Sequence, residues 1–127
     1  MSAFSFSEAP RIVLGSDNWR LISAVSNALL TAGFNVDTAN DYIDTETLWR
    51  QSRHEVVLLE VSYPDSVEPA IKSALRIKRQ NAQQFIAYLA DASLRMSGLT
   101  GDAILSRDTN RLPHDLRAAI SEQSQTN

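Results

Sequence analysis

One six-residue segment, Val56–Val61, restricts the fold of this chain more than any other part of the sequence. It reads Val-Val-Leu-Leu-Glu-Val, so it is apolar on both faces up to the acidic residue Glu60 near its end. A strand of this kind is typical of the centre of a parallel sheet that helices cover on both sides. The segment therefore predicts an α/β domain with Glu60 at the carboxyl end of a central strand.

Strand and helix patterns alternate along the rest of the chain. Four other short runs, rich in β-branched or apolar residues, predict strands at residues 11–15, 34–38, 85–90 and 103–106. Segments with apolar residues at helical spacing separate these strands. The alternation implies right-handed crossovers and a doubly wound, five-stranded parallel sheet, with a binding crevice at the carboxyl ends of the strands.

The first two helices follow from their cap residues and their spacing. Asp17 or Asn18 caps a helix directly after the first strand, because both side chains can accept a hydrogen bond from a free backbone N–H group. A second helix is predicted over residues 41–52. It packs through three apolar side chains: Ile43, Leu48 and Trp49.

The later helices are less alike in length. Ser66 caps a third helix, and Pro113 opens a last helix over residues 113–120. Between Asp91 and Asp102 two glycines leave room for about two helical turns at most. The fourth helix is therefore predicted to be shortened.

The chain has the size and composition of one ordinary domain. It has 127 residues, of which 43% are hydrophobic and 21% are charged, and such a chain buries a core of its own. We expect the domain to cover residues 11–122. Residues 1–10 and 123–127 are predicted to be loose segments.

Charge and residue usage exclude several classes of function. The formal net charge is −3 and the twelve Lys and Arg residues are scattered along the sequence, so we expect no nucleic-acid partner. The chain has no cysteine and two histidines, which leaves almost no material for a transition-metal site or a hydrolytic triad. No apolar run approaches the roughly 20 residues that cross a bilayer, and no secretory leader is recognisable, so we expect a cytoplasmic protein without membrane contact.

The sequence resembles the receiver domains of bacterial response regulators over about residues 11–122. The most specific match is the run Val-Val-Leu-Leu-Glu-Val-Ser-Tyr-Pro-Asp at residues 56–65, where the family has apolar residues, a phosphoaccepting aspartate and a proline four positions later. The resemblance makes Glu60 the equivalent of the phosphoacceptor. Ser16 and Asp17 correspond to the acidic pair of the family pocket, of which only Asp17 is retained.

The remaining functional positions of the family have also changed. Leu89 lies where the family has a Ser or Thr that follows the phosphoryl group, and Ile104 lies where it has an aromatic switch residue. Arg107 corresponds to the lysine that contacts the anion, and Asp108 to a proline. The resemblance also implies a flavodoxin-like fold with the strand order 2-1-3-4-5.

These changes predict a phosphorylation pocket that has decayed. The extra methylene of Glu60 moves the carboxylate by roughly 1 Å, and a displacement of that size costs on the order of a hundredfold in rate. Serine in place of an acid at Ser16 removes a negative charge from a site that would bind Mg²⁺. We therefore expect no cofactor, with Asp17 and Glu60 as weak candidates for metal ligands. Asp91 and Asp108 follow strands and would be needed to rebuild such a site.

Glu60 has three interpretations from sequence. It accepts a phosphoryl group as the family's aspartate does, or its longer side chain imitates the phosphorylated state beside Arg107. In the third interpretation Glu60 forms an ion pair with Arg107 at the end of the strand and has no further role. The histidines do not distinguish between these, because His54 precedes the central strand and lies at the opposite end of the sheet.

The favoured function is that of a stand-alone, receiver-like signalling module of a two-component type system, which works without phosphorylation and is not an enzyme. Its partner would be a kinase, an output protein or a second copy of the chain. In the family the docking face consists of the fourth helix, the fifth strand and the fifth helix, where this chain offers Leu94, Met96 and Leu99. The alternatives are a working phosphoreceiver that uses Mg²⁺ with Glu60, and a small α/β enzyme of other chemistry.

Overall fold

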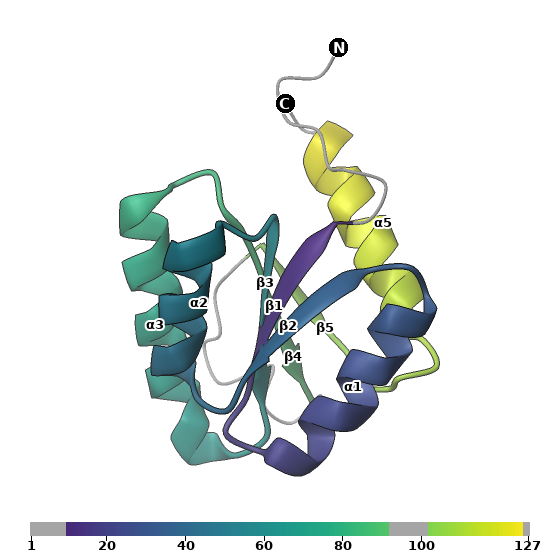
Figure 1. Ribbon diagram of the computed structural model, residues 1–127, viewed down its shortest axis with the longest axis horizontal. Coiled ribbons are helices and arrows are strands. Elements are labelled where there is room, and N and C mark those ends of the chain that lie inside the picture. Colours follow the sequence, from purple (N-terminus) through teal and green to yellow (C-terminus); the bar gives the residue numbers. More distant parts are fainter. Residues whose placement is uncertain (1–9, 92–101, 126–127) are drawn as a thin grey trace.

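The five predicted strands form one parallel sheet in the order β2-β1-β3-β4-β5, which confirms the predicted fold class. The computed structural model describes residues 10–91 and 102–125 of the chain (Figure 1). The central strand is the segment that the sequence marked as buried on both faces, and all six of its residues are buried. The strands are β1 (Arg11–Gly15), β2 (Asn35–Ala39), β3 (Val56–Val61), β4 (Phe85–Ala90) and β5 (Ala103–Leu105).

Helices cover both faces of the sheet. One face is covered by α1 (Trp19–Thr31) and α5 (Leu112–Gln125), and the other by α2 (Tyr42–Ser52) and α3 (Val67–Gln80) (Figure 1). A short 3₁₀ turn, η1 (Pro64–Ser66), leads from β3 into α3. Within the described parts of the chain, no helix combines the length and the apolar composition that a membrane span requires.

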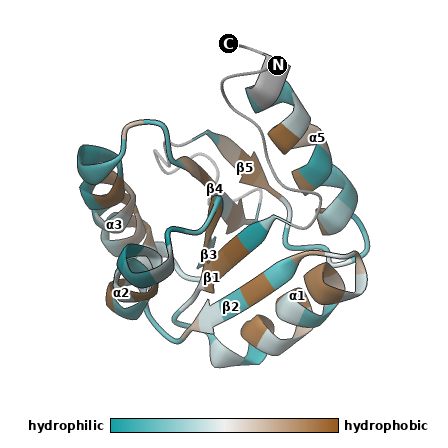
Figure 2. Cartoon of the chain, turned by 45° about the horizontal axis from the view of Figure 1, so that its top comes forward, coloured by the Kyte–Doolittle hydropathy of each residue, from teal (hydrophilic) through white to brown (hydrophobic). Residues whose placement is uncertain are grey.

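The core lies in two layers, one on each side of the sheet. Alternate residues of the central strand point to opposite faces, so Val57 and Leu59 pack with α2 and α3, while Val56 and Leu58 pack with α1 and α5. Figure 2 shows the hydrophobic colour concentrated on the strands and on the inner sides of the helices. This two-layer packing fixes the carboxyl end of β3, where Glu60 lies.

Side-chain caps hold the helix starts next to that end of the sheet. Asn18 caps α1 by accepting a hydrogen bond from the N–H group of Arg20, and Asp41 caps α2 by accepting one from Asp44 at 2.7 Å. Ser66 does occupy the position before α3, but its side chain makes no capping bond. The predicted cap at Ser66 is therefore wrong, and its hydroxyl is used elsewhere.

The inner face of α2 differs from the prediction. Its buried residues are Tyr42, Thr45, Glu46 and Trp49, which share one side of the helix, whereas Ile43 is 60% exposed. Ile43 was predicted to pack because it is apolar. The buried side instead contains polar residues that have hydrogen-bonding partners: Glu46 accepts from Ser73 and Arg76 on α3, and Thr45 donates to the backbone oxygen of Asp41. Hydrophobicity alone therefore did not identify it.

The ends of the domain also differ from the expected bounds. Helix α5 continues to Gln125, beyond the predicted end at Ile120 and into the segment predicted to be loose. Pro10 is buried, and its carbonyl oxygen accepts a hydrogen bond from the N–H of Asn35, so it belongs to the folded part. The predicted short helix between Asp91 and Asp102, with Leu94, Met96 and Leu99, falls on residues 92–101 and lies outside the described residues.

Close packing explains why residue 15, at the end of β1, is a glycine. A Cβ atom added there would overlap the side-chain oxygen of Thr45 on α2. The absence of a side chain lets α2 approach the end of β1 closely. Gly15 therefore sets the distance between this helix and the carboxyl end of the sheet.

Candidate functional site

Glu60 lies at the carboxyl end of the central strand with its carboxylate inside the domain. Its exposed fraction is 1%. The hydroxyl of Ser16, at the end of β1, donates to one carboxylate oxygen at 2.5 Å, and the hydroxyl of Ser62 lies 2.9 and 2.7 Å from the two oxygens. Arg107 lies 3.0 Å from the second oxygen. Both oxygens of Glu60 are thus already hydrogen-bonded.

Arg107 is the cation of this pocket. Its guanidinium group forms ion pairs with Glu60 and with Asp91, which directly follows β4. It also donates to the hydroxyl of Ser62 at 3.1 Å. Burial lowers the pKa of Arg107, but the hydrogen bonds and charges of Asp91 and Glu60 outweigh it and raise the pKa above its ordinary value. The predicted ion pair between Glu60 and Arg107 is present, although Glu60 is buried rather than solvated.

Asn18 links the two serines that hold Glu60. Its side-chain amide donates to the hydroxyl of Ser62 at 3.1 Å, and its backbone N–H donates to the hydroxyl of Ser16 at 2.9 Å. Ser62 therefore donates one hydrogen bond to the carboxylate and accepts two, from Asn18 and Arg107, which uses the full capacity of a hydroxyl group. The result is a closed polar network between β1, β3 and the residues after β5.

Asp17 is next to this network but does not join it. Its side chain is exposed, and one of its oxygens accepts a hydrogen bond from the hydroxyl of Ser66.

Tyr42 closes the pocket from the side of α2, because its hydroxyl donates to the backbone oxygen of Glu60 at 2.7 Å. Burial, followed by the charges of Asp17 and Glu60, raises the pKa of Tyr42 above its ordinary value.

The two positions that correspond to the family's switch lie on opposite faces of the sheet. Leu89 is directly opposite Glu60 in the register of β3 and β4, and it is fully buried among the residues that pack with α1 and α5. Ile104 is partly buried and packs on the side of α2 and α3. Neither side chain carries a hydroxyl group, so they offer no polar connection from the carboxylate to β5.

Among the residues that the structure describes, the acids held by Arg107 do not fit a Mg²⁺ site, and the candidate ligand Asp17 lies outside their network, where it accepts a hydrogen bond from Ser66. A site for this hard cation needs carboxylate oxygens with free lone pairs, and those of Glu60 and Asp91 are turned toward Arg107. Asp108, the other residue considered for metal binding, accepts a hydrogen bond from the backbone of Asn110. Over residues 10–91 and 102–125 no group of three or more metal-ligating side chains comes together.

The histidines lie away from this pocket. His54 is 1% exposed and contacts Asp37 on β2 at 2.7 Å, at the amino end of the sheet. His114 is exposed in the first turn of α5. Neither side chain reaches Glu60, as the sequence predicted.

A hollow of about 640 Å³ opens in front of the network. Two large aromatic side chains border it: Trp19 is 70% exposed and Tyr63 is 50% exposed. Trp19 is thus an exposed aromatic side chain beside the crevice at the carboxyl ends of the strands. The complete lining is Asp17, Asn18, Trp19, Arg20, Leu21, Tyr63 and Arg107.

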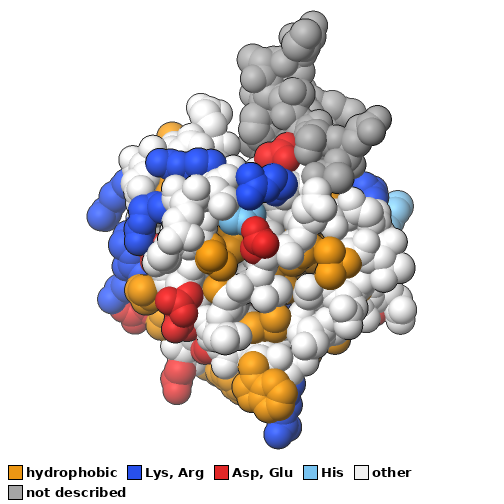
Figure 3. Space-filling view, viewed as in Figure 1, with side chains coloured by type: hydrophobic (Ala, Val, Ile, Leu, Met, Phe, Trp, Pro, Cys, Tyr) orange, Lys and Arg blue, Asp and Glu red, His pale blue; other side chains and the backbone are white. Residues whose placement is uncertain are grey.

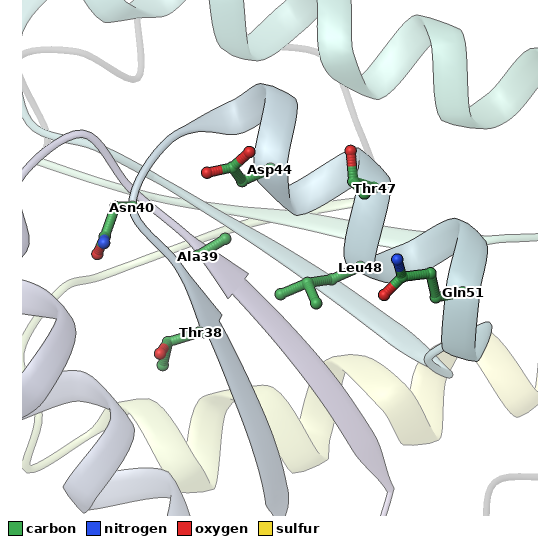
Figure 4. A pocket seen from close by; sticks show the side chains of 7 residues that line it. All are labelled: Thr38, Ala39, Asn40, Asp44, Thr47, Leu48 and Gln51. Carbon is green, nitrogen blue, oxygen red and sulfur yellow. The ribbon is translucent and has the colours of Figure 1, made fainter.

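Two further hollows lie at the edges of the sheet. One, of about 520 Å³, lies between β5 and α5, with Ile104, Leu105 and Ala119 among its lining residues. The other, of about 320 Å³, lies between β2 and α2 (Figure 4). Figure 4 shows the side chains of Asp44 and Thr47 on the helix and those of Thr38 and Asn40 on the strand side of this hollow. Neither hollow is lined by Glu60 or Arg107.

Three residues of the network were not identified from the sequence. Ser62 lies two positions after Glu60 at the end of the same strand, which is a signal that could have found it. Asn18 was considered only as a helix cap, and it is also a cap in the structure. Tyr42 could not be found, because its position depends on how α2 packs against the sheet.

Comparison with known proteins gives matches among solved structures alone. No model of a known protein family matches the chain. No curated protein sequence matches it. Residue identity with the similar solved structures is low, whereas the agreement of the backbones is high.

Several of the similar structures are response regulators. A response regulator from Thermotoga maritima is 21% identical, with 89% of this chain and 98% of that chain covered and a TM-score of 0.73. The chemotaxis response regulator CheY4 of Vibrio cholerae is 20% identical, with 87% and 98% covered and a TM-score of 0.70. TrrA of Thermotoga maritima, solved in complex with Mg²⁺-BeF, is 17% identical, with 90% and 98% covered and a TM-score of 0.73.

Proposed function

We propose that this chain, which has the fold of response-regulator receiver domains, is a receiver-like signalling module that works without phosphorylation. Its role is to bind a protein of a two-component type system, either a kinase or an output protein, and it catalyses no reaction of its own. We place it in the cytoplasm, with neither nucleic acid nor membrane as a direct partner.

The observation that supports this proposal is the state of the Glu60 carboxylate. An acceptor must present a carboxylate oxygen in line with the phosphorus of a donor, while a metal ion neutralises the transferred group. Glu60 is 1% exposed, and its oxygens are held by Ser16, Ser62 and Arg107. Arg107 already supplies the positive charge that a metal ion would bring, so the pocket has an internal cation in place of an exchangeable one.

The experiment tests whether the pocket accepts a phosphoryl group or binds a mimic of one. The purified chain is incubated with Mg²⁺ and acetyl phosphate, and its intact mass is measured. In parallel, Mg²⁺ with beryllofluoride is titrated while the fluorescence of Trp19, at the mouth of the pocket, is followed. We expect neither a gain of one phosphoryl group nor a saturable change in fluorescence.

A matched control restores the chemistry that the pocket lacks. The triple variant Ser16→Asp, Glu60→Asp, Arg107→Lys has the acidic pair, the shorter acceptor and the point charge of the family pocket. It should respond to Mg²⁺ where the natural chain does not. If the natural chain gains a phosphoryl group and Glu60→Gln abolishes the gain, it is a working phosphoreceiver and the proposal is wrong.

A further inference from the structure

Two exposed aromatic side chains line the hollow in front of the Glu60 network. Trp19, the first residue of α1, is 70% exposed, and Tyr63, directly before η1, is 50% exposed. Both belong to the hollow of about 640 Å³, a volume within the roughly 300–1,000 Å³ of ordinary ligand sites. Figure 3 shows an exposed hydrophobic side chain beside a basic one at the lower edge of the molecule, where α1 begins. The hollow therefore offers aromatic surface on which an incoming group can stack.

The two cations that line this hollow already have partners. Arg107 forms ion pairs with Glu60 and Asp91. The guanidinium group of Arg20 lies over the ring of Trp19, 5.5 Å from its centre. Counting the acids bound to Arg107, the charged side chains around the hollow are three acids and two bases: Asp17, Glu60 and Asp91 against Arg20 and Arg107. The balance of charge therefore favours an incoming cation over an anion.

Asp17 is the acid of the hollow that has no cation. Its side chain is exposed, and its hydrogen bond comes from the uncharged hydroxyl of Ser66. Over residues 10–91 and 102–125, no Lys, Arg or His side chain forms an ion pair with it. A cation that entered the hollow would therefore meet a carboxylate and aromatic rings together.

Arg20 indicates which cation suits these rings. A guanidinium group is planar, so it stacks on an aromatic ring and binds a carboxylate with two parallel hydrogen bonds, whereas an ammonium group is a compact and strongly hydrated charge. The stacking of Arg20 on Trp19 is an example within the chain itself. Because 70% of Trp19 is still exposed, most of its surface remains open to a second group.

We propose that this hollow receives an arginine side chain of the partner protein, which stacks on Trp19 and Tyr63 and pairs with Asp17. The inference rests on the proposed function, because it names the chemistry by which the module recognises its protein partner. A cation–ring contact and an exposed ion pair each change a binding equilibrium about two- to fivefold. One arginine therefore selects the partner, and the surrounding contact surface supplies most of the affinity.

The experiment follows the indole N–H signals of the complete chain by NMR while the blocked peptide acetyl-Gly-Arg-Gly-amide is added. The chain has two tryptophans, and Trp49 is the internal control, because it is buried and its indole N–H donates to Gln84 at 2.8 Å. We expect the signal of Trp19 to shift with peptide concentration and that of Trp49 to stay in place. The same peptide with citrulline, the uncharged analogue of arginine, should bind about fivefold more weakly.

Three variants separate the contributions, and circular dichroism checks that each one folds. Asp17→Asn should bind the arginine peptide about two- to fivefold more weakly. Asp44→Asn is the matched control and should bind as the natural chain does, because Asp44 is an exposed acid of the other hollow, between β2 and α2. Arg20→Ala should bind the peptide about two- to fivefold more tightly, because it frees the ring of Trp19 and removes a like charge.

Several outcomes overturn the inference. They are the absence of a shift at Trp19, equal binding of the citrulline peptide, and weaker binding by Arg20→Ala. Tighter binding of acetyl-Gly-Glu-Gly-amide also overturns it and assigns the hollow to an anion. Acetyl phosphate labelling tests the proposed function separately, so a chain that gains no phosphoryl group and ignores the arginine peptide retains that function and loses this inference alone.

Discussion

Glu60 is an ionisable side chain inside the domain, and among residues 10–91 and 102–125 its ion-pair partner is Arg107. Moving a carboxylate out of water costs several kcal/mol, which a protein recovers through a close opposite charge and hydrogen bonds. Arg107 provides that charge at 3.0 Å, and Ser16 and Ser62 provide the hydrogen bonds. The pair therefore specifies how β3 and the residues after β5 fit together.

Arg107→Ala tests this dependence. The substitution leaves the buried carboxylate without its cation, and such a change costs about 3–5 kcal/mol in the free energy of unfolding. Urea denaturation followed by circular dichroism measures it. The matched control is Arg111→Ala, because Arg111 is exposed and lies 3.9 Å from Asp115, an arrangement that contributes less than about 0.5 kcal/mol. Equal losses in the two variants would contradict the importance of the Glu60 ion pair.

The site residues that sequence reasoning could predict are those fixed by strand ends. Glu60, Asp17 and Arg107 each lie at or just beyond the end of a strand, and parallel strands bring their carboxyl ends to one edge. The roles of Ser62 and Asn18 depend on the directions in which their side chains point in the folded protein. Spacing along the chain contains no information of that kind.

At the scale of the elements, a buried polar contact joins α2 and α3 beside their shared apolar core. Glu46 on α2 is 3% exposed, and it accepts hydrogen bonds from Ser73 at 2.6 Å and from Arg76 at 2.9 and 2.7 Å. Burial raises the pKa of Glu46, but these hydrogen bonds outweigh it, and the pKa is lowered from its ordinary value of 4.5. The contact therefore makes stability depend on pH.

The dependence can be measured with Glu46→Gln. A carboxyl group whose pKa is lowered by folding adds stability above its ordinary pKa, and this stability is lost as the pH falls through the lowered value. The variant should be less stable than the natural chain by about 1–3 kcal/mol at pH 7. The difference should shrink below pH 4.5, as followed by denaturation at several pH values. Glu68→Gln is the control, because Glu68 is 78% exposed and its loss should cost less than about 0.5 kcal/mol.

Gly15→Ala tests the close approach of α2 to β1. The new methyl group would overlap Thr45, and overpacking of this kind costs about 1–3 kcal/mol of unfolding free energy. Thermal denaturation of the variant measures the loss. The double variant Gly15→Ala, Thr45→Ala should lose less than the sum of the two single variants, because the shortened side chain relieves the overlap. Strict additivity would show that Gly15 has a different role.

The bounds of the most apolar elements were the easiest to predict from the sequence. Strands β3 and β4 are buried along their whole length, so their bounds followed from hydrophobicity alone. The inner side of α2 was misidentified, because two of its buried residues are polar. Glu46 is buried through hydrogen bonds to Ser73 and Arg76 on α3, which are distant in sequence. The hydroxyl of Thr45 donates to the backbone oxygen of Asp41 at the start of its own helix. Local patterns predict helices and strands, but they do not predict which polar residues will find partners.

For the whole molecule, stability should not depend on Mg²⁺. A ligand present at about one hundred times its dissociation constant adds about 2.7 kcal/mol to the free energy of unfolding, which raises the melting temperature of a domain of this size by several degrees. We expect the same melting temperature in Mg²⁺, in a chelator and in a sodium salt of equal ionic strength. An upward shift that is specific to Mg²⁺ would reveal a metal site that the ion pairs of Arg107 do not exclude.

The ion pair between Glu60 and Arg107 also sets an order of events during synthesis. The two residues are 47 positions apart, and ribosomes add roughly 5–20 residues per second, so Glu60 is made about 2–9 s before its cation. Throughout that interval the nascent chain has its central strand but not the charge that allows the end of this strand to be buried. The domain therefore closes only after β5 has been made, and the arginine that fills the pocket in the finished protein also determines when the sheet is completed.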